Sequence, residues 1–425
     1  KELWSCVWKY LPRYYSPTLT PATRAILEHG SADAPLGALV SLIHQNDRSA
    51  ETRARMSGFL QNEHANVREL AGEYLLWHGH EPHRAALSAA MQKESDVYAR
   101  GSIEAALAAL DRRKKSPSLP DTLTLSAPLS YAEALTRLRS KDTPESRAEA
   151  FALYAWKEPF EPHCAYRGQT LSNAFLAERQ ARLQLQATLF SVPINMFAEQ
   201  TVFRGAFSAP EATTLIAPVR TFFDPARQSY AKDMKDSKDG FGGMVHIGDD
   251  ILWNREHRSV VSIGNGLVRQ VSCTPTWGTV IVVEHTLPFA QKVCSLYAHL
   301  SPFICVRPGE VVTQGQKLGA IGRSFAYENG GYLSHLHFGI HEGPYGLLPH
   351  PGGMADVRWQ GVQYRGKVLD ANPEETGIEI FTPRGVYHVR KPTTWVSGYI
   401  SKRAWDEGQH GWCDPQKFIR EHLNP

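Results

Sequence analysis

The strongest constraint on the fold is a change of sequence texture near residue 215. From about residue 20 to 112, Ala, Leu, Arg and Glu dominate, and apolar residues recur three and four positions apart, which is the spacing of one helix face. After about residue 215, Val, Ile, Thr and Gly increase, and short apolar runs end at turn residues, a pattern typical of strands. We therefore expect a multi-domain α+β protein, with a helical N-terminal region followed by a mostly antiparallel β domain.

A weak internal repeat lies within residues 1–112. Asn66-Val67-Arg68 resembles Asp96-Val97-Tyr98, and a helical pattern follows each segment. Asn66 and Asp96 are residue types that favour a helix N-cap. A period of about 30 residues with paired short helices favours HEAT-like repeats, which usually form a scaffold or a surface for a protein partner. An irregular helical bundle fits the same pattern equally well.

The remaining boundaries follow from composition. The basic, proline-containing segment 113–125 is predicted to be a linker. Residues 126–205 are predicted to be a mixed helical and connecting region, with helical patterns at 131–138 and 145–155. Residues 206–425 are predicted to form the β domain, with a core at 215–345 and a C-terminal extension.

Two segments of the predicted β domain carry strong turn signals. Val260–Val271 gives a strand–turn–strand pattern around Gly264-Asn265-Gly266. Pro308–Gly319 predicts a second tight hairpin region.

Charge and cysteine usage exclude some classes of protein. The net charge of +3 does not indicate nucleic-acid binding. No apolar run reaches the roughly 18 residues that a membrane helix needs, and no signal peptide is visible. The six cysteines form no CxxC pair, so a cysteine zinc site is not expected. Disulfides and buried free thiols both remain open, with Cys294 and Cys305 as the first pair to check.

Three short segments of the β region bring histidines and an aspartate into a metal-binding pattern. His246 and Asp250 are four positions apart across a glycine, and His299 ends a Tyr-Ala-His sequence. His335 and His337 are two apart, so in a strand they project from the same face. Two histidines and one carboxylate suit zinc, whose catalytic sites usually have three protein ligands and one open position. Among nearby polar residues, His285 is interpreted as structural or at the rim, Asp249 is predicted to point away from Asp250, and His341 is predicted to support the site from behind.

These segments are similar to those of the LytM/lysostaphin-type (M23) metallopeptidases, which carry HxGxD, then Y-x-H-L, then H-L-H-F. The glycine-containing run at 307–322 also resembles the hairpin that precedes the last motif, and the resemblance covers about residues 215–345. It implies a zinc-dependent endopeptidase that hydrolyses the stem peptides or cross-links of bacterial peptidoglycan. It implies zinc ligands and catalytic histidines as follows: His246, Asp250 and His337 bind Zn²⁺, and His299 and His335 are catalytic.

The implied chemistry is hydrolysis by a water that zinc activates and histidines deprotonate. The sequence contains no HExxH motif that would supply a glutamate base. A second hypothesis is a non-catalytic LytM-like regulator or scaffold that binds other wall hydrolases. A peptidoglycan substrate implies a periplasmic or extracellular protein. The scissile bond, the oligomeric state and an inhibitory, targeting or scaffolding role of the helices are left open.

Overall fold

The computed structural model describes most of the chain. The described residues are 23, 34–44, 47, 49–114, 130–143, 145–147, 150, 173–190, 203, 205, 209–223, 229–232, 244–251, 256–274, 277–324, 326, 329, 332–345, 354–359, 362–371, 375–392, 399–406 and 410–423. Residues 115–125 of the predicted linker and most of the helical pattern at 145–155 lie outside these residues, whereas Arg113 and Lys114 are described and lie at the end of a helix.

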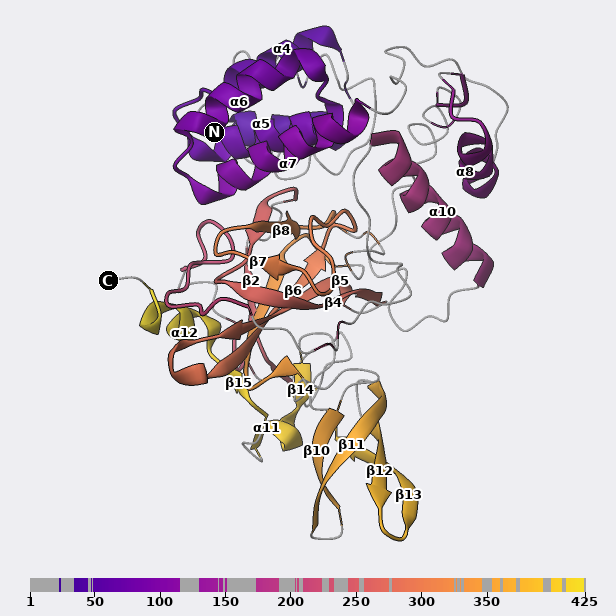
Figure 1. The fold of residues 1–425 in the computed structure, drawn as a ribbon, viewed down its shortest axis with the longest axis vertical. Coiled ribbons are helices and arrows are strands. Elements are labelled where there is room, and N and C mark those ends of the chain that lie inside the picture. Colours follow the sequence, from indigo (N-terminus) through magenta and orange to yellow (C-terminus); the bar gives the residue numbers. More distant parts are fainter. Residues whose placement is uncertain are drawn as a thin grey trace.

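Helices form the N-terminal part of the molecule (Figure 1). Their bounds are α3 Ala34–His44, α4 Ala50–Phe59, α5 Ala65–His78, the 3₁₀ turn η3 Glu81–His83, α6 Arg84–Lys93, α7 Val97–Arg113, α8 Tyr131–Ser140 and α10 Asn173–Phe190. One apolar core joins them, with Leu39 of α3, Tyr74 of α5, Leu135 of α8 and Leu185 of α10 as buried members. The mixed region predicted at 126–205 therefore contributes helices to the N-terminal core.

Some helix starts follow the capping chemistry of the sequence, whereas α5 and α6 begin after His64 and His83 without a side-chain cap. Asp96 caps α7, because its side chain accepts hydrogen bonds from the backbone nitrogens of Tyr98 and Ala99. The prediction for Asn66 is wrong: α5 begins at Ala65 with His64 at the N-cap position, and Asn66 lies inside the first turn. The HEAT-like interpretation stays a prediction, whereas a helical region followed by an antiparallel β domain is confirmed.

The β domain is built on one large antiparallel sheet. In the described part of the chain this sheet has the order β15-β9-β6-β5-β4-β7, and β2 also pairs with β9. Its strands are β2 Asp249–Ile251, β4 Gly266–Thr274, β5 Gly278–Thr286, β6 Lys292–Leu300, β7 Val311–Val312, β9 Leu336–Glu342 and β15 Trp412–Cys413. Two buried apolar clusters include residues of the large sheet, one with Val283, Tyr297 and Phe338 and the other with Val282 and Leu296.

Strand pairing agrees with the strand–turn–strand pattern at Val260–Val271 and corrects the predicted hairpin at Pro308–Gly319. The strand β3 (Ser259–Val261) pairs with β8 (Lys317–Ala320), whereas β4 pairs with β7. Strands that are neighbours in sequence thus exchange partners, and neither Val260–Val271 nor Pro308–Gly319 closes on itself as a hairpin. Long-range pairing overrode the local turn signals, since the turn residues fix a reversal of direction but not the partner strand.

The C-terminal extension returns to the core after forming a separate sheet. This four-stranded antiparallel sheet contains β10 Met354–Trp359, β11 Val362–Ala371, β12 Glu375–Thr382 and β13 Gly385–Pro392, and it projects from the bottom of the view in Figure 1. The chain then adds β14 (Tyr399–Ser401) to β1 (Met244–His246), continues through α11 (Lys402–Asp406) and β15, and ends with α12 (Pro415–Glu421). The sequence patterns did not predict this separate sheet.

Cys294, Cys305 and Cys413 are free thiols. The Cys294–Cys305 disulfide is therefore absent. In the described residues, no helix combines the length and the hydropathy that a membrane span requires.

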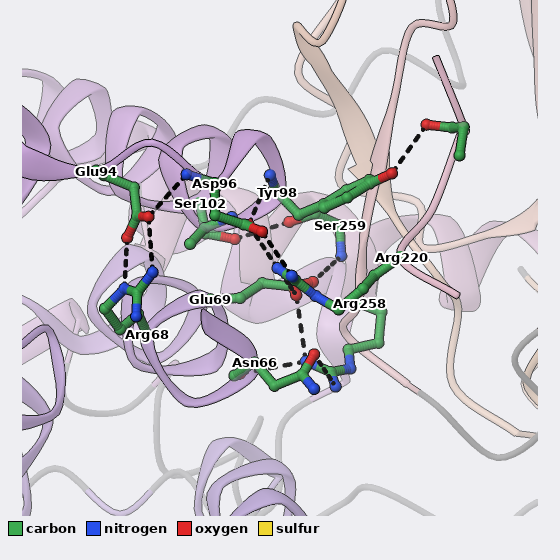
Figure 2. A network of polar contacts seen from close by, with 12 residues as sticks. Asn66, Arg68, Glu69, Glu94, Asp96, Tyr98, Ser102, Arg220, Arg258 and Ser259 are labelled. Atoms are coloured by element: carbon green, nitrogen blue, oxygen red, sulfur yellow. Dashed lines mark hydrogen bonds and ion pairs between the residues drawn. The ribbon is translucent and has the colours of Figure 1, made fainter. Parts of the chain in front are cut away.

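The helices dock on the β domain through buried charges (Figure 2). One carboxylate oxygen of Glu69 accepts the backbone N–H of Ser259 at 2.7 Å, and the other lies 3.2 Å from Arg258 Nη1 and 3.4 Å from Arg220 Nη2. Lys317 Nζ of β8 donates to Glu73 at 2.7 Å. Because these carboxylates are only 1–2% exposed, they depend on these partners for stability.

Candidate metal centre

Strand register brings the two ends of the histidine–aspartate pattern together. On β2, Asp250 lies directly opposite His337 of β9, and on the other side of β9, His337 lies opposite Ala298 of β6. His246 precedes β2 by a short turn at Gly248, and His299 follows Ala298 on β6. Antiparallel pairing of these strands thus gathers residues that are up to 91 positions apart in sequence.

Three histidine rings converge on a single oxygen of Asp250. His337 Nδ1 lies 3.0 Å from Asp250 Oδ1, His246 Nε2 lies 3.3 Å from it, and His335 Nε2 lies 3.5 Å from it. All three rings are nearly inaccessible, with exposed fractions of 1–2%, whereas the Asp250 side chain is 14% exposed.

Backbone carbonyls set the tautomers of two of these rings. His246 Nδ1 lies 3.1 Å from the carbonyl of Ser229, and His335 Nδ1 lies 2.6 Å from the carbonyl of Leu333. A carbonyl only accepts, so both Nδ1 atoms carry the hydrogen. In the neutral rings each Nε2 then directs a lone pair at the Asp250 carboxylate, an arrangement that a cation between them would stabilise.

His299 reaches the centre through an unusual backbone. It has φ of 61°, and its N–H donates to the carbonyl of Trp277 at 3.1 Å. The β5–β6 pairing is irregular at this point, between Thr279 and Ile281, which is how a bulge redirects a side chain. The ring lies 4.5 Å from that of His335, centroid to centroid, and its Nδ1 donates to the carbonyl of Asn329 at 2.9 Å.

A segment that no motif predicted supports His246 and Asp250. Ser229 accepts the backbone N–H of Asp250 at its Oγ and, as described above, holds His246 by its carbonyl. Asp249 in turn accepts the backbone N–H groups of Ser229 and Tyr230 at 2.8 and 3.0 Å. The prediction that Asp249 points away from Asp250 agrees with strand alternation, and its role is to fix the segment behind His246.

Two aromatic residues also border the centre. Trp277 packs edge-on against His337 at 5.2 Å and stacks against His299 at 6.4 Å, and Tyr332 lies 4.7 Å from the His299 ring. Sequence reasoning missed both, together with Asn329. Tyr332 precedes His335 by only three positions, and this proximity was the one available signal. The chain contains ten tryptophans, and nothing in the pattern separated Trp277 from the others.

Burial and neighbouring charge act in opposite directions on these groups. Burial disfavours the Asp250 carboxylate, but the His246 and His335 rings outweigh it and hold the pKa of Asp250 well below its usual range. Burial also disfavours charge on His246, yet Asp250 outweighs it and raises the pKa of that ring. Burial, with the neighbouring His335 and His337 rings, holds the pKa of His299 well below its usual range. Burial lowers the pKa of His337 to about 4. At neutral pH the site thus combines an anionic Asp250 carboxylate with neutral His299 and His337 rings.

The residues fit a zinc ion. One donor atom from each of His246, Asp250 and His337 lies within 4.8 Å of the other two, and two imidazoles with one carboxylate form a common catalytic zinc set. His337 Nε2 is buried and has no hydrogen-bond partner. A Cβ on Gly248 would lie 2.7 Å from this Nε2 and 2.5 Å from the carbonyl of Phe338, so only glycine permits this close approach.

Comparison with known proteins agrees with this geometry. Residues 245–347 match Peptidase family M23, and the match contains all three histidine segments. This part of the chain is a peptidase family M23 domain. No curated protein matches the chain.

Three matches to solved structures cover part of the chain. A LytU structure is 19% identical, with a TM-score of 0.19, and the match covers 33% of this chain and 80% of that one. A complex of SpoIIIAH and SpoIIQ gives 21% identity, a TM-score of 0.20 and coverage of 36% and 92%. A lytM structure from Ruminococcus gnavus gives 17% identity, a TM-score of 0.18 and coverage of 50% and 80%.

Two other histidines of the M23 domain have structural surroundings. His285 is fully buried, and its ring contacts the Asn265 carbonyl at 2.8 Å and the Ser295 hydroxyl at 2.7 Å. His341 packs against Trp412 at 5.1 Å and lies opposite it in the β9–β15 pair. The interpretation of His285 as structural agrees with these contacts. The predicted supporting role of His341 stays a prediction, since its described contacts are with the C-terminal strand.

Proposed function

We propose that this protein is a zinc-dependent endopeptidase that hydrolyses peptide bonds in bacterial peptidoglycan, within stem peptides or cross-links. The observation that carries the proposal is the convergence of His246, His335 and His337 on one Asp250 oxygen inside an M23 domain. His246, Asp250 and His337 would hold Zn²⁺. When bound, the ion would polarise the scissile carbonyl and lower the pKa of a water molecule.

His299 and His335 supply the proton chemistry in this proposal. Each ring donates its Nδ1 hydrogen to a backbone carbonyl, of Asn329 and Leu333 respectively. Each neutral ring therefore keeps a lone pair on Nε2, which can accept a proton and return it to the leaving amine nitrogen. Fixing Nδ1 also fixes ring orientation, so the proton-accepting atom is in place before substrate arrives.

A peptidoglycan substrate places this protein outside the cytoplasm, in the periplasm or at the cell surface. The helices provide a large additional surface, and a protein partner for them is part of the proposal. The described charged contacts that α5 and α7 make with the β domain fall on Arg220, His257, Arg258 and Lys317, not on the histidines of the centre. This arrangement supports a scaffolding or targeting role for the helices over one that blocks the centre.

The test is release of soluble fragments from purified peptidoglycan, analysed by mass spectrometry. We expect cleavage by the zinc-loaded protein, loss of cleavage in His337→Ala and with a chelator, and recovery from chelation when zinc is restored. His64→Ala is the matched control, because that side chain is 58% exposed and lies far along the chain from the motifs. If the zinc-loaded protein binds peptidoglycan of several wall types without cutting it, the enzyme hypothesis fails and the hypothesis of a non-catalytic regulator takes its place.

A further inference from the structure

His299 is held in a conformation that it would not adopt alone. Its φ of 61° lies in the left-handed region, where a residue other than glycine costs on the order of 1–3 kcal/mol and persists only if its surroundings fix it. The residues that hold the His299 backbone in this conformation are therefore the ones that position its side chain.

Backbone bonds hold His299 from both sides. Its N–H donates to Trp277, and its carbonyl accepts the N–H of Gly322 at 3.0 Å. A Cβ on Gly322 would lie 2.8 Å from the His299 carbonyl oxygen, so the two backbones approach more closely than any other residue would permit. The position of the 321–322 backbone therefore determines one of the two anchors of His299.

That backbone is held in turn by residues 256–258. Ile321 donates its N–H to the carbonyl of Arg258 at 2.9 Å and accepts the N–H of His257 at 3.1 Å. Glu256 accepts the N–H of Ser324 at 2.8 Å. Ser324 Oγ accepts the N–H of Ser334, the residue before His335, at 3.0 Å. The same short segment thus supports the backbones beside both proposed catalytic histidines.

The helical region grips this segment by its charged side chains (Figure 2). Glu69 of α5 accepts the N–H of Ser259 and the guanidinium of Arg258. Arg258 Nη2 also donates to the Asn66 side chain at 2.9 Å, and His257 Nδ1 lies 3.7 Å from Glu73. With Glu69 1% and Arg258 8% exposed, neither group has water as a substitute partner.

We propose that Glu69 is a positioning residue for His299, acting through Arg258, Ile321 and Gly322. The inference rests on the proposed function in one respect only, namely that His299 takes part in hydrolysis. The helical region is accordingly a working part of the peptidase centre and not a separable module.

If the helices had a purely structural role, breaking any one buried bond between the helices and the β domain would affect His299 to the same extent. Asp96 and Arg220 supply the comparison, because they form a second ion pair between α7 and the β domain, and Asp96→Asn leaves the contact between Arg220 Nη2 and Glu69 in place. Arg220 lies in the segment 209–223, whose backbone bonds run from Val261 to Pro218 and from Ile216 to Ile263, away from Ile321. Asp96→Asn keeps an N-cap residue on α7 and is the matched control.

The experiment compares Glu69→Gln and Asp96→Asn in the full-length protein labelled with ¹⁵N-histidine. Long-range proton–nitrogen spectra report the Nδ1–H tautomer of His299, assigned by its loss in His299→Gln, with and without Zn²⁺. We expect Glu69→Gln to shift the His299 ring signals and to lower kcat about 10- to 100-fold with little change in KM. Asp96→Asn should leave both unchanged despite a comparable loss of stability.

Unchanged His299 signals in a folded Glu69→Gln protein would overturn the proposal, as would equal shifts in the two variants. Should Glu69→Gln fail to fold, Asn66→Ala removes a single acceptor of Arg258 and is expected to give a smaller shift of the same signals. Because the spectra need no substrate, they still test the positioning role if the wild type cleaves no peptidoglycan. In that case the proposed function fails while the inference about Glu69 is judged separately.

Discussion

The metal centre and the interface between helices and sheet are both buried polar clusters, but their charges are balanced differently. At the interface each carboxylate meets a cation of the same chain, Glu69 with Arg258 and Glu73 with Lys317. At the metal centre, Asp250 meets imidazole nitrogens, and those of His246 and His335 are fixed as acceptors when neutral. The first cluster is complete within the protein, whereas we propose that a cation completes the second. The comparison teaches that a missing charge, more than burial itself, distinguishes a binding centre from a structural network.

The largest expected effect is loss of the central carboxylate charge. Asp250→Asn keeps the shape of the side chain but removes the anion on which three rings converge. We expect peptidoglycan hydrolysis to fall by more than the roughly 100-fold that loss of an outer partner of a metal site costs. The measurement is fragment release. Near-normal cleavage by Asp250→Asn would contradict the proposed difference between the metal centre, which needs a cation, and the interface, which does not.

The interface should respond in stability. Lys317→Met leaves Glu73 buried without its cation, and breaking a buried pair in this way costs about 3–5 kcal/mol. Urea unfolding measures this loss of stability relative to the wild type, and the difference should be the same with and without added zinc. Arg100→Ala is the control, because the Arg100–Glu104 pair is about half exposed and should contribute at most about 1 kcal/mol. Equal losses in both variants would contradict the account.

Close packing at Gly248 should matter to the metal and not to the helices. Gly248→Ala places a Cβ against His337 Nε2 and the Phe338 carbonyl, so we expect zinc affinity to fall roughly 10- to 100-fold. Gly58→Ala is the matched change, since no atom lies within 4 Å of a Cβ there and Gly58 lies in α4. It should stabilise the protein by about 0.5–1 kcal/mol. Unaltered zinc binding by Gly248→Ala would show that the close approach is not needed.

The smallest expected effect is a dependence of the interface on pH. Burial alone would raise the pKa of Glu73, but Lys317 and then His257 outweigh it and lower the pKa from 4.5 to about 2. A lowered folded-state pKa means that this stabilisation is complete above the unfolded value and declines as the pH falls from 4.5 towards 2. The stability difference between wild type and Lys317→Met should therefore narrow below about pH 4.5. A constant difference in urea unfolding down to about pH 3 would contradict this assignment.

The sequence located the cluster of His246, Asp250 and His337 better than the connections around it. Close spacing within each segment marked these residue types as a group that could bind a metal, whereas their assignment as zinc ligands comes from the resemblance to M23 metallopeptidases and stays a prediction. Asn329 acts on His299 through its backbone carbonyl, which any residue type supplies. Ser229 acts through its carbonyl and its Oγ, and a lone serine outside any motif gives no sequence signal. Gly264-Asn265-Gly266 correctly marked the break between β3 and β4, but the partners of these strands depend on contacts about 45–60 residues away.

The interface shows a second limit of sequence reasoning. Asn66 was interpreted as a helix cap from its residue type, whereas its side chain accepts a hydrogen bond from Arg258, 192 positions away. Glu and Lys are residue types that ordinarily lie on the surface of a helix or a strand, so the sequence did not mark Glu69 and Lys317 as buried. They are buried only because α5 docks on the β domain, and this contact produces no hydrophobic periodicity in the sequence of either segment.

The most direct test of the central claim is calorimetric titration of metal-free protein with Zn²⁺. The account predicts one ion bound per chain, with binding lost in Asp250→Asn and retained in Lys317→Met under conditions where that variant is folded. Absence of zinc binding by the wild type, or binding that survives Asp250→Asn unchanged, would contradict it.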